Sequence, residues 1–280
     1  MKLCVFSSGS KGNSSLIQTE EFNILVDCGI SKKDLVTNLE LSNLTLNDID
    51  YLFITHEHID HIRSFNVMLK TKCVIYISKG SLSYIYDYYN NKGQFKDLEL
   101  LNNKLNNKEI ITFNRINNSL FYEPININNI NVDIIPLSHD CNEPTGFLFT
   151  EKSKKLCYIT DTGIVHSDFF DLINNCDCYL LESNHDPEVL MASDRPYYLK
   201  LRILGDNGHL SNEDSMYILT RVIGKNTKLI LHAHVSEECN LSHIIELTRK
   251  RVFKDYKIDE SNFNFYILEA RRSKEFEIWK

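Results

Sequence analysis

The sequence predicts an α/β protein built as a four-layer αββα sandwich. Short apolar runs rich in β-branched and aromatic residues alternate with segments of helical periodicity in both halves of the 280-residue chain. Polar clusters follow several of these runs directly, which places reactive side chains along one edge of two predicted sheets. Because the chain shows no internal repeat and no long linker, we expect residues 1–280 to form a single domain.

The first third of the chain predicts five strands and three helices. The strands correspond to apolar runs at residues 3–7, 15–18, 23–27, 51–55 and 74–78. Helical patterns fit residues 32–41, 59–69 and 80–89. The strand at residues 51–55 ends in the most polar cluster of the region, so the functional argument starts there.

The remainder predicts further short strands and three more helices. Asn-rich turns separate short strands from about residue 98 to residue 147. Strands at residues 156–160, 178–182 and 228–232 then alternate with helices near residues 168–173, 212–223 and 241–251. A last strand at residues 264–268 precedes a basic terminus.

A cluster of potential metal ligands follows the predicted strand at residues 51–55. The next six residues read His-Glu-His-Ile-Asp-His and supply His56, His58, Asp60 and His61. His56 and His58 are two positions apart, so on an extended segment both rings point to the same side. Imidazole and carboxylate together suit zinc, manganese or iron better than calcium or magnesium. The stretch therefore predicts a metal site rather than a His-rich surface loop.

Three later candidates follow predicted strands in the same way. They are His139, Asp161 and His234, and each stands where an apolar run meets a polar turn. Singly each is weak, but their repetition in one structural setting supports a shared site. His232 lies two residues before His234 on the same strand face. We favour His234 as the ligand because it is nearer the strand end, and expect His232 to be packed or to act behind the ligands.

Composition and charge limit the remaining function classes. The net charge of −7 argues against a protein that coats nucleic acid, although it allows a nuclease with local basic patches. No apolar stretch is long enough for a transmembrane helix. The N-terminus has the pattern of a strand rather than of a signal peptide, so we expect a cytoplasmic protein without a membrane partner. Most of the eight cysteines lie beside apolar runs, which favours reduced thiols.

This order of motifs resembles that of the metallo-β-lactamase-fold hydrolases. Asp27 matches the first motif of the family, and the remaining candidates follow in family order over essentially the whole chain. The resemblance implies two divalent ions, zinc or manganese, with iron also suited to the donors. It assigns His56, His58 and His139 to one ion, Asp60, His61 and His234 to the other, and Asp161 to both. Asp27 would orient the ligand loop.

The implied two-metal site predicts hydrolysis. Two ions about 3.5–4 Å apart activate a water molecule and stabilise the attacking and leaving oxygens. Asp60 thereby counts among the catalytic residues as well as the ligands. Di-iron redox proteins share this fold, but they usually replace a cluster histidine and add a flavin module, and this chain shows neither departure.

Two further stretches offer groups for proton transfer. Glu182 ends a predicted strand, and His209 precedes Ser211, a predicted helix cap. In tRNase Z, a member of the family, a Glu and a His in similar places protonate the leaving group, so Glu182 and His209 are the candidate acid–base pair. His185 is a second candidate for the same role.

The stretch from residue 194 to residue 202 predicts a substrate contact. Arg195, Lys200 and Arg202 alternate with tyrosines, a pattern that suits phosphate contact and base stacking. The alternative is a helix start with a solvated face. The position between two candidate site motifs favours the functional interpretation.

The combination of these motifs with Ser8-Gly9-Ser10-Lys11-Gly12-Asn13 resembles the small bacterial WalJ/YycJ-like nuclease branch of the fold. That resemblance implies a metal-dependent phosphodiesterase, a 5′-to-3′ exonuclease acting on DNA rather than RNA. The interval between Asp161 and His234 is too short for the inserted domain of RNase J. A small-ester or thioester hydrolase (lactonase or glyoxalase-like), an RNA-processing nuclease of the tRNase Z type and a regulatory metal-binding protein remain as alternatives. The sequence does not determine the oligomeric state, and a homodimer is one of the states that it allows.

Overall fold

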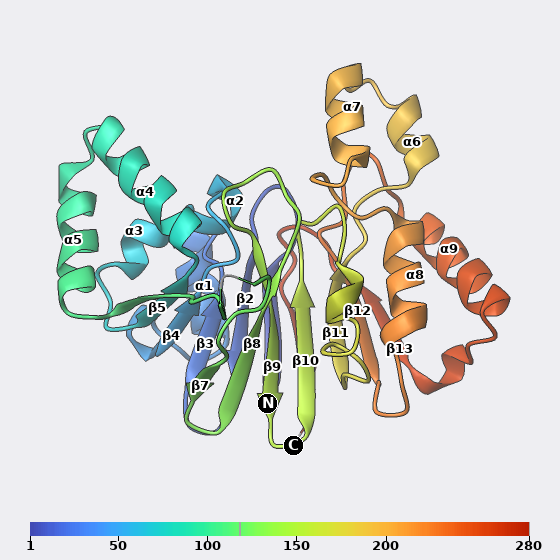
Figure 1. The fold of residues 1–280 in the computed structure, drawn as a ribbon, viewed down its shortest axis with the longest axis horizontal. Coiled ribbons are helices and arrows are strands. Elements are labelled where there is room, and N and C mark those ends of the chain that lie inside the picture. The colour runs from blue at the N-terminus through green and yellow to red at the C-terminus, as the bar shows by residue number, and fades with distance from the viewer. Residues whose placement is uncertain (118, 280) are drawn as a thin grey trace. The chain divides into compact units, whose positions relative to one another are not determined.

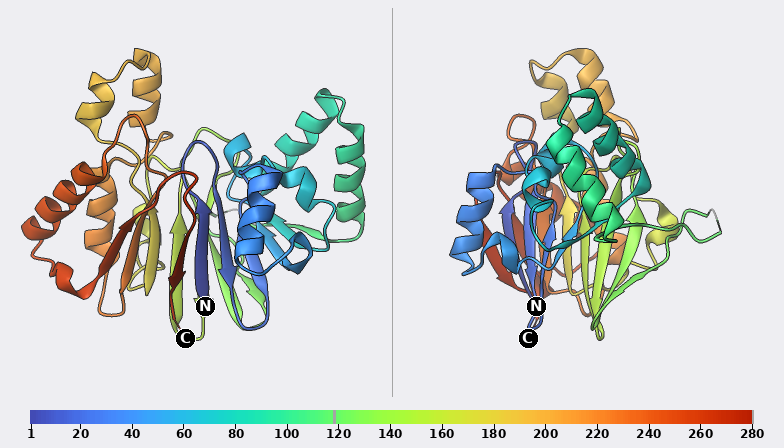
Figure 2. Two further views of the ribbon diagram at one scale, coloured as in Figure 1. Left: turned by 180° about the vertical axis from the view of Figure 1, so that it is seen from behind. Right: turned by 90° about the vertical axis from the view of Figure 1, so that its left-hand side faces the viewer.

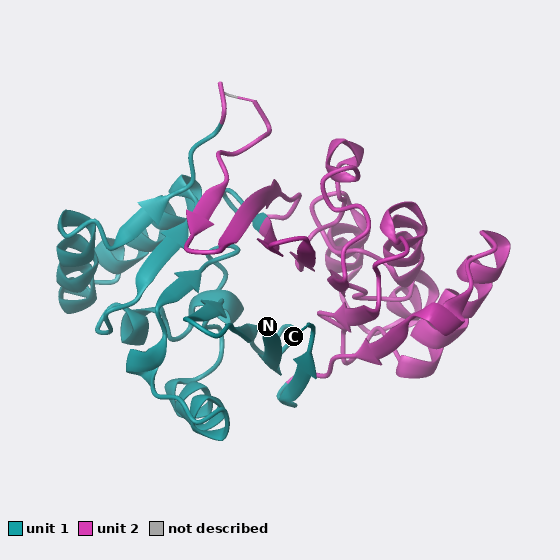
Figure 3. Cartoon of the chain, turned by 90° about the horizontal axis from the view of Figure 1, so that it is seen from below, with its two compact units in different colours: residues 1–115, 141–145, 271–280 teal, residues 116–140, 146–270 magenta. Residues whose placement is uncertain are grey.

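A computed structural model describes residues 1–117 and 119–279 of the chain. Within these residues the strands form two seven-stranded sheets, and the chain divides into two compact units with one sheet each. Unit 1 comprises Met1–Arg115, Cys141–Thr145 and Arg271–Lys280, and unit 2 comprises Ile116–Asp140 and Gly146–Ala270 (Figure 3). Each unit is therefore assembled from more than one segment, and the single domain at residues 1–280 stays a prediction.

The sheet of unit 1 has the strand order β14-β1-β2-β3-β4-β5-β6. Its strands are β1 (Lys2–Ser7), β2 (Ser14–Gln18), β3 (Asn23–Val26), β4 (Tyr51–Phe53), β5 (Val74–Ile77), β6 (Ile110–Thr112) and β14 (Lys274–Glu277). The strands from β14 to β3 pair antiparallel, whereas those from β3 to β6 pair parallel. Parallel pairing brings the carboxyl ends of β3, β4 and β5 to one edge of the sheet, where their loops begin.

Helices cover one face of this sheet (Figures 1 and 2). They are α1 (Lys32–Leu41), α2 (Ile59–Ile62), α3 (Phe65–Met68), α4 (Lys79–Asn91) and α5 (Phe95–Asn106), with a 3₁₀ helix η1 (Leu46–Asp48). Leu39, Ile85 and Leu101 from three of the helices are fully buried in one cluster with Leu52 and Ile75 of the sheet. This apolar layer fixes the sheet whose edge carries the candidate ligands.

The sheet of unit 2 has the order β13-β12-β11-β10-β9-β8-β7. Its strands are β7 (Ile125–Ile127), β8 (Ile130–Pro136), β9 (Thr145–Glu151), β10 (Lys154–Ile159), β11 (Cys178–Glu182), β12 (Leu229–Ala233) and β13 (Asn264–Ile267). Strands β10 to β13 pair parallel, while β7 with β8 and β9 with β10 pair antiparallel. The carboxyl ends of β10, β11 and β12 therefore meet at one edge.

The helices of unit 2 fall into two groups (Figure 1). They are α6 (Pro187–Ala192), α7 (Tyr197–Leu204), α8 (Asn212–Val222) and α9 (Ser242–Asp255), with 3₁₀ helices η2 (Ser167–Phe169) and η3 (Glu260–Asn262). Leu219 of α8 and Phe253 of α9 are fully buried against the sheet with Tyr179 and Ile230. The α6–α7 hairpin instead stands beyond the carboxyl ends of the strands.

The predicted helix at residues 59–69 is wrong as a continuous element. It divides into α2 and α3 because Ser64 leaves the helical hydrogen-bond pattern between them. The main-chain nitrogen of Ser64 donates to Cys28 at 2.9 Å, and its hydroxyl donates to the carbonyl of Ile30 at 2.7 Å. These tertiary bonds hold the segment after the candidate ligands at residues 56–61 against the start of α1.

Three other expectations are also corrected. The Asn-rich region expected to hold only short strands begins with α5, whose leucines at helical spacing pack into the core. The helix expected near residues 168–173 shortens to η2, and Asn175 with a φ of 55° follows it. The basic terminus forms β14, which pairs with β1. For α5 and β14, long-range contacts outweighed local composition.

No helix within residues 1–117 and 119–279 has the length and apolar character needed to span a bilayer. All eight cysteines lie in the described chain, and none of them forms a disulfide. Seven thiols are buried, and Cys141 is half-buried. Burial raises the pKa of Cys4 and of Cys176 to about 12, so these thiols are mostly protonated at neutral pH.

We expect one thiol of the native protein to react quickly with an aromatic disulfide reagent such as DTNB. Cys141 is the accessible one, and Cys141→Ser should remove the fast phase, while guanidinium should expose all eight. The measurement is absorbance of the released thiolate with time. A fast phase that survives in Cys141→Ser would contradict this assignment.

Candidate metal centre

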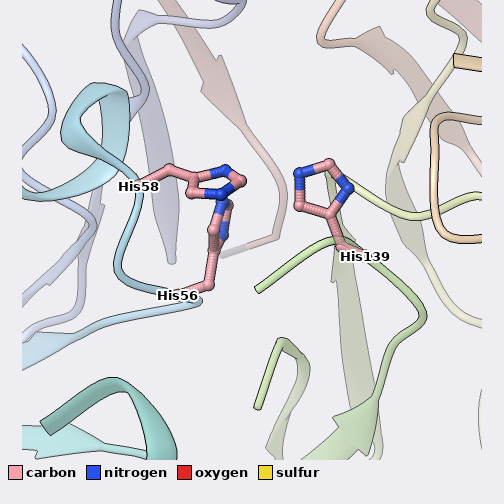
Figure 4. Close-up of side chains that lie close together, drawn as sticks. All are labelled: His56, His58 and His139. Carbon is pink, nitrogen blue, oxygen red and sulfur yellow. The ribbon is translucent and has the colours of Figure 1, made fainter. Parts of the chain in front are cut away.

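In unit 1 the three cluster histidines gather after β4, with His56 and His58 on the loop and His61 in α2. His56 and His61 are buried and His58 is half-buried. The ring of His56 lies 4.6 Å from that of His58 and 4.0 Å from that of His61, measured between centroids. Figure 4 shows His56 and His58 with their rings close together. Asp60 lies in the first turn of α2, next to His61.

A buried carboxylate sets the orientation of His61. Asp27 follows β3, and its carboxylate oxygens accept hydrogen bonds from the main-chain nitrogen and hydroxyl of Thr55, both at 2.8 Å. His61 Nδ1 lies 2.7 Å from Asp27 Oδ2 and therefore carries the proton, which leaves Nε2 as the acceptor. Asn13 Nδ2 lies 2.9 Å from that Nε2. A metal ligand presents such an unprotonated nitrogen to the ion, so the tautomer of His61 fits a divalent ion.

We expect Asp27→Asn to weaken metal binding by about 10- to 100-fold, because groups that orient a ligand have effects of this size. An amide can keep one bond to Thr55, but it no longer stabilises the Nδ1–H tautomer of His61. The measurement is competition for Zn²⁺ or Mn²⁺ against a chelating dye. Asp50→Asn, at an exposed carboxylate near the opposite end of β4, is the control and should leave affinity unchanged.

The sequence did not identify Glu57 as a site residue, although it lies between two cluster histidines. Its side chain is buried, with Oε2 accepting from the hydroxyl of Ser81 at 2.6 Å. Oε1 accepts from the main-chain nitrogen and side chain of Asn142 at 2.7 and 2.8 Å. Glu57 therefore anchors the ligand loop to α4 and to the 141–145 segment. Only its position inside the motif could have signalled this role.

In unit 2 a second cluster follows the parallel strands. Asp161 comes after β10, Glu182 ends β11 and His234 comes after β12, while His209 lies in the loop before α8. Ligand atoms of these four residues all lie within 4.8 Å of one another. His234 Nε2 lies 3.2 Å from Asp161 Oδ1. The strand pairing thus brings together residues that are up to 73 positions apart in the chain.

Glu182 connects the two histidines of this cluster. Its Oε1 lies 2.7 Å from Nδ1 of His209 and 2.9 Å from Nδ1 of His234, and its Oε2 accepts from the main-chain nitrogen of Thr162 at 2.8 Å. Complete burial by itself raises the pKa of Glu182, but the two histidines outweigh burial and lower the pKa to about 2. Glu182 is therefore a carboxylate at neutral pH, and it directs Nε2 of each histidine away from itself.

Three site residues adopt left-handed backbone conformations directly after their strands. Asp27, Asp161 and His234 have φ values of 58°, 55° and 51°. Such values are uncommon for residues other than glycine and mark positions held by their surroundings. For His234 the support includes Asn184, whose side chain donates to the His234 carbonyl at 2.7 Å. No feature of the sequence indicated this role of Asn184.

His139, labelled in Figure 4, belongs to unit 2 and follows β8 in the chain. Its Nδ1 lies 2.9 Å from the carbonyl of Gly208 and therefore donates to it, which again leaves Nε2 as the acceptor. Nε2 lies 3.2 Å from Asp140 Oδ1. Burial lowers the pKa of His139, so the neutral ring that a metal ligand requires is favoured.

The two remaining histidine candidates are enclosed in the core of unit 2. His232 is fully buried, stacks on Phe265 with centroids 6.2 Å apart, and burial lowers its pKa to about 3. Burial also lowers the pKa of His185 to about 4. Neither ring has a hydrogen-bond partner within the described residues. The structure places His234, and neither of these two, beside Asp161.

The predicted substrate-binding cations lie on and around the α6–α7 hairpin. Lys200 is buried, and its ammonium donates to the carbonyls of Met191 and Ser193 at 2.7 and 2.6 Å. This contact joins α7 to the end of α6, so the position of Lys200 supports a structural role rather than substrate binding. Arg195 forms an ion pair with Glu238, and Arg202 forms one with Asp140.

Comparisons with known proteins agree with this geometry. A family model described as "Beta-lactamase superfamily domain" matches residues 22–233. The chain is 32% identical over 249 residues to the exodeoxyribonuclease WalJ of Streptococcus pneumoniae serotype 2, which covers 88% of this chain and 86% of that protein. It is 31% identical over 251 residues to the exodeoxyribonuclease YycJ of Bacillus anthracis, which covers 90% and 88%.

A solved structure shows the same fold. The metallo-β-lactamase fold protein YhfI from Bacillus subtilis superposes with a TM-score of 0.66 at 17% identity, covering 99% of both chains. The predicted fold class, an α/β sandwich of the metallo-β-lactamase type, is confirmed by this likeness and by the family match. This chain therefore belongs to the β-lactamase superfamily.

Proposed function

We propose that this protein is a metal-dependent nuclease that removes nucleotides from DNA, in the 5′-to-3′ direction. The observation that carries the nuclease assignment is the similarity over 88% of the chain to a protein named as an exodeoxyribonuclease. The cluster of Asp161, Glu182, His209 and His234 supports hydrolysis, because it combines potential metal ligands with a histidine oriented for proton transfer.

We further propose the ligand sets that follow the family's motif order. His56, His58 and His139 would hold one divalent ion, and Asp60, His61 and His234 the other, with Asp161 shared. The fixed Nδ1–H tautomers of His61 and His139 support this, since both present Nε2 as the ligand atom. Zinc or manganese suits these donors. When bound, two such ions would activate water and neutralise charge on the phosphate.

The histidine–carboxylate pair would handle the proton of the leaving oxygen. His209 Nδ1 donates to Glu182, so a proton on Nε2 makes the ring an imidazolium that this carboxylate stabilises. The side chain of His209 is 17% exposed whereas that of Glu182 is fully buried, so only His209 can reach substrate. His209 would therefore donate the proton, and Glu182 would position it.

An end-labelled DNA assay tests the proposed function. Metal-stripped protein is expected to be inert, and Mn²⁺ or Zn²⁺ should restore stepwise release of mononucleotides from the 5′ ends of duplex DNA. Matched RNA strands should be cut more slowly. Turnover of a lactone or thioester with no cleavage of DNA under any metal would replace this proposal with an ester hydrolase.

A further inference from the structure

A cavity of about 400 Å³ lies in unit 1, next to the loop between β1 and β2. Its polar lining comes from four separate segments of the chain and comprises Ser7, Lys11, Ser31, Asp34, Asn38, Arg63 and Arg271. These segments are the end of β1 with the β1–β2 loop, α1 with its N-cap residue, the turn between α2 and α3, and the stretch before β14. The cavity is within the size range of protein ligand sites.

Positive charge predominates around this cavity. Lys11, Arg63 and Arg271 face a single acidic residue, Asp34, although the whole chain carries a net charge of −7. Asp34 Oδ2 accepts a hydrogen bond from the hydroxyl of Ser31 at 2.7 Å in the cap of α1. Within residues 1–117 and 119–279, the guanidinium groups of Arg63 and Arg271 form no ion pair. Two such groups beside one cavity favour an anionic ligand.

The main chain at both arginines is held in place. The hydroxyl of Ser7 accepts a hydrogen bond from the main-chain nitrogen of Arg271 at 3.0 Å, which ties the segment before β14 to the end of β1. Arg63 directly precedes Ser64, whose bonds to Cys28 and Ile30 fix that turn. The two side chains therefore extend from main-chain positions that are held in place beside the cavity, which reduces the backbone entropy lost when a ligand binds.

The same loops also carry the candidate ligands of unit 1. Arg63 comes two residues after His61, and Lys11 comes two residues before Asn13. The main-chain nitrogen of Asn13 donates to the carbonyl of Asp60 at 2.7 Å, and its side chain contacts His61. The cavity is thus connected through two short segments to the part of the metal centre that holds Asp60 and His61.

We propose that this cavity binds one phosphate group of the DNA strand, a neighbour of the phosphate at which the strand is cleaved. The inference rests on the proposed nuclease function and adds a binding site to it. Guanidinium groups can form two parallel hydrogen bonds to a phosphate, and Lys11 adds charge. Anchoring a neighbouring phosphate would hold the strand against the metal centre without reading its sequence.

Strand binding without turnover tests the site. Metal-loaded protein is titrated into a fluorescent single strand with phosphorothioate linkages that resist hydrolysis, and anisotropy is followed at several salt concentrations. Arg63→Gln and Arg271→Gln should each weaken binding several-fold, and the double variant by about 10-fold or more. The slope of log K against log salt is negative, and each lost phosphate contact should reduce its magnitude by about 0.7. Arg221→Gln, at an exposed position of α8, is the matched control and should leave both quantities unchanged.

The outcomes separate this site from the proposed function. If the double variant binds the strand like the wild type, with the same salt slope and melting temperature, the proposed phosphate site is overturned. The proposed nuclease function is not affected by that result. A double variant that loses affinity for deoxynucleoside monophosphate or inorganic phosphate, but not for the strand, assigns the cavity to a free product and also overturns the proposal. If the wild type binds the strand through these arginines but cleaves no nucleic acid, the phosphate site is supported and the proposed nuclease function is refuted.

Discussion

His209→Gln is expected to lower kcat for DNA hydrolysis by about 10²- to 10⁴-fold, the usual contribution of a positioned proton donor. The amide can keep a hydrogen bond to Glu182, but it holds no transferable proton where Nε2 stood. Substrates with a nitrophenolate leaving group need no such proton, so thymidine 5′-p-nitrophenyl phosphate should lose much less rate than DNA. Steady-state kinetics on both substrates measure the difference.

Metal content decides whether this effect comes from proton transfer. His209 lies within reach of Asp161 and His234, so the variant must be shown by elemental analysis to keep the wild-type amount of metal. His166→Gln removes an exposed histidine paired with Asp168 and should leave activity unchanged. Equal losses on DNA and on the nitrophenyl ester, or loss of metal, would assign His209 to the metal centre instead of to acid catalysis.

Asp161→Asn is expected to have the second large effect, a loss of activity of more than about 100-fold with a lower metal content. Removal of the proposed shared ligand should exceed the 10- to 100-fold effect typical of groups that only orient ligands. An amide oxygen carries no charge and coordinates first-row metals weakly. The measurements are elemental analysis after dialysis against buffer and the rate of nucleotide release from DNA.

The backbone at this position makes asparagine a suitable replacement. Asp161 has a φ of 55°, a conformation that asparagine tolerates better than most residues, so the variant should fold. Asp168→Asn, at a half-exposed carboxylate outside the cluster, is the control. Wild-type metal content together with wild-type activity in Asp161→Asn would remove this residue from the metal centre, and with it the shared-ligand arrangement.

Much of the fold could be predicted from local patterns of apolar and polar residues. The apolar runs that predicted strands at residues 51–55, 74–78 and 178–182 became β4, β5 and β11 almost at the expected bounds. Predictions failed where long-range packing decided the outcome. Asn-rich α5 is helical because its leucines pack on the sheet, and the helix at residues 59–69 is interrupted because Ser64 bonds to the start of α1.

The candidate site was readable to a similar extent. The spacing of His56, His58, Asp60 and His61 is unusual enough to stand out in a single sequence, and so is the repeated placement of polar residues after strands. Residues that act through main-chain bonds were not readable. Glu57 and Asn184 hold site segments in place, but an anchoring carboxylate or amide looks like any other polar residue until its partners are known.

The sequence by itself determined the superfamily, the strand ends that carry the candidate ligands and the chemical type of each candidate, because these depend on residue identity and short-range periodicity. Only the tertiary structure decided which atoms are available. The bond from Asp27 to His61, the contact of Lys200 with the end of α6 and the gathering of Arg63 and Arg271 around one cavity join positions distant in the chain. The tautomer, charge and accessibility of a side chain depend on neighbours that are distant in the chain, and local sequence does not identify those neighbours.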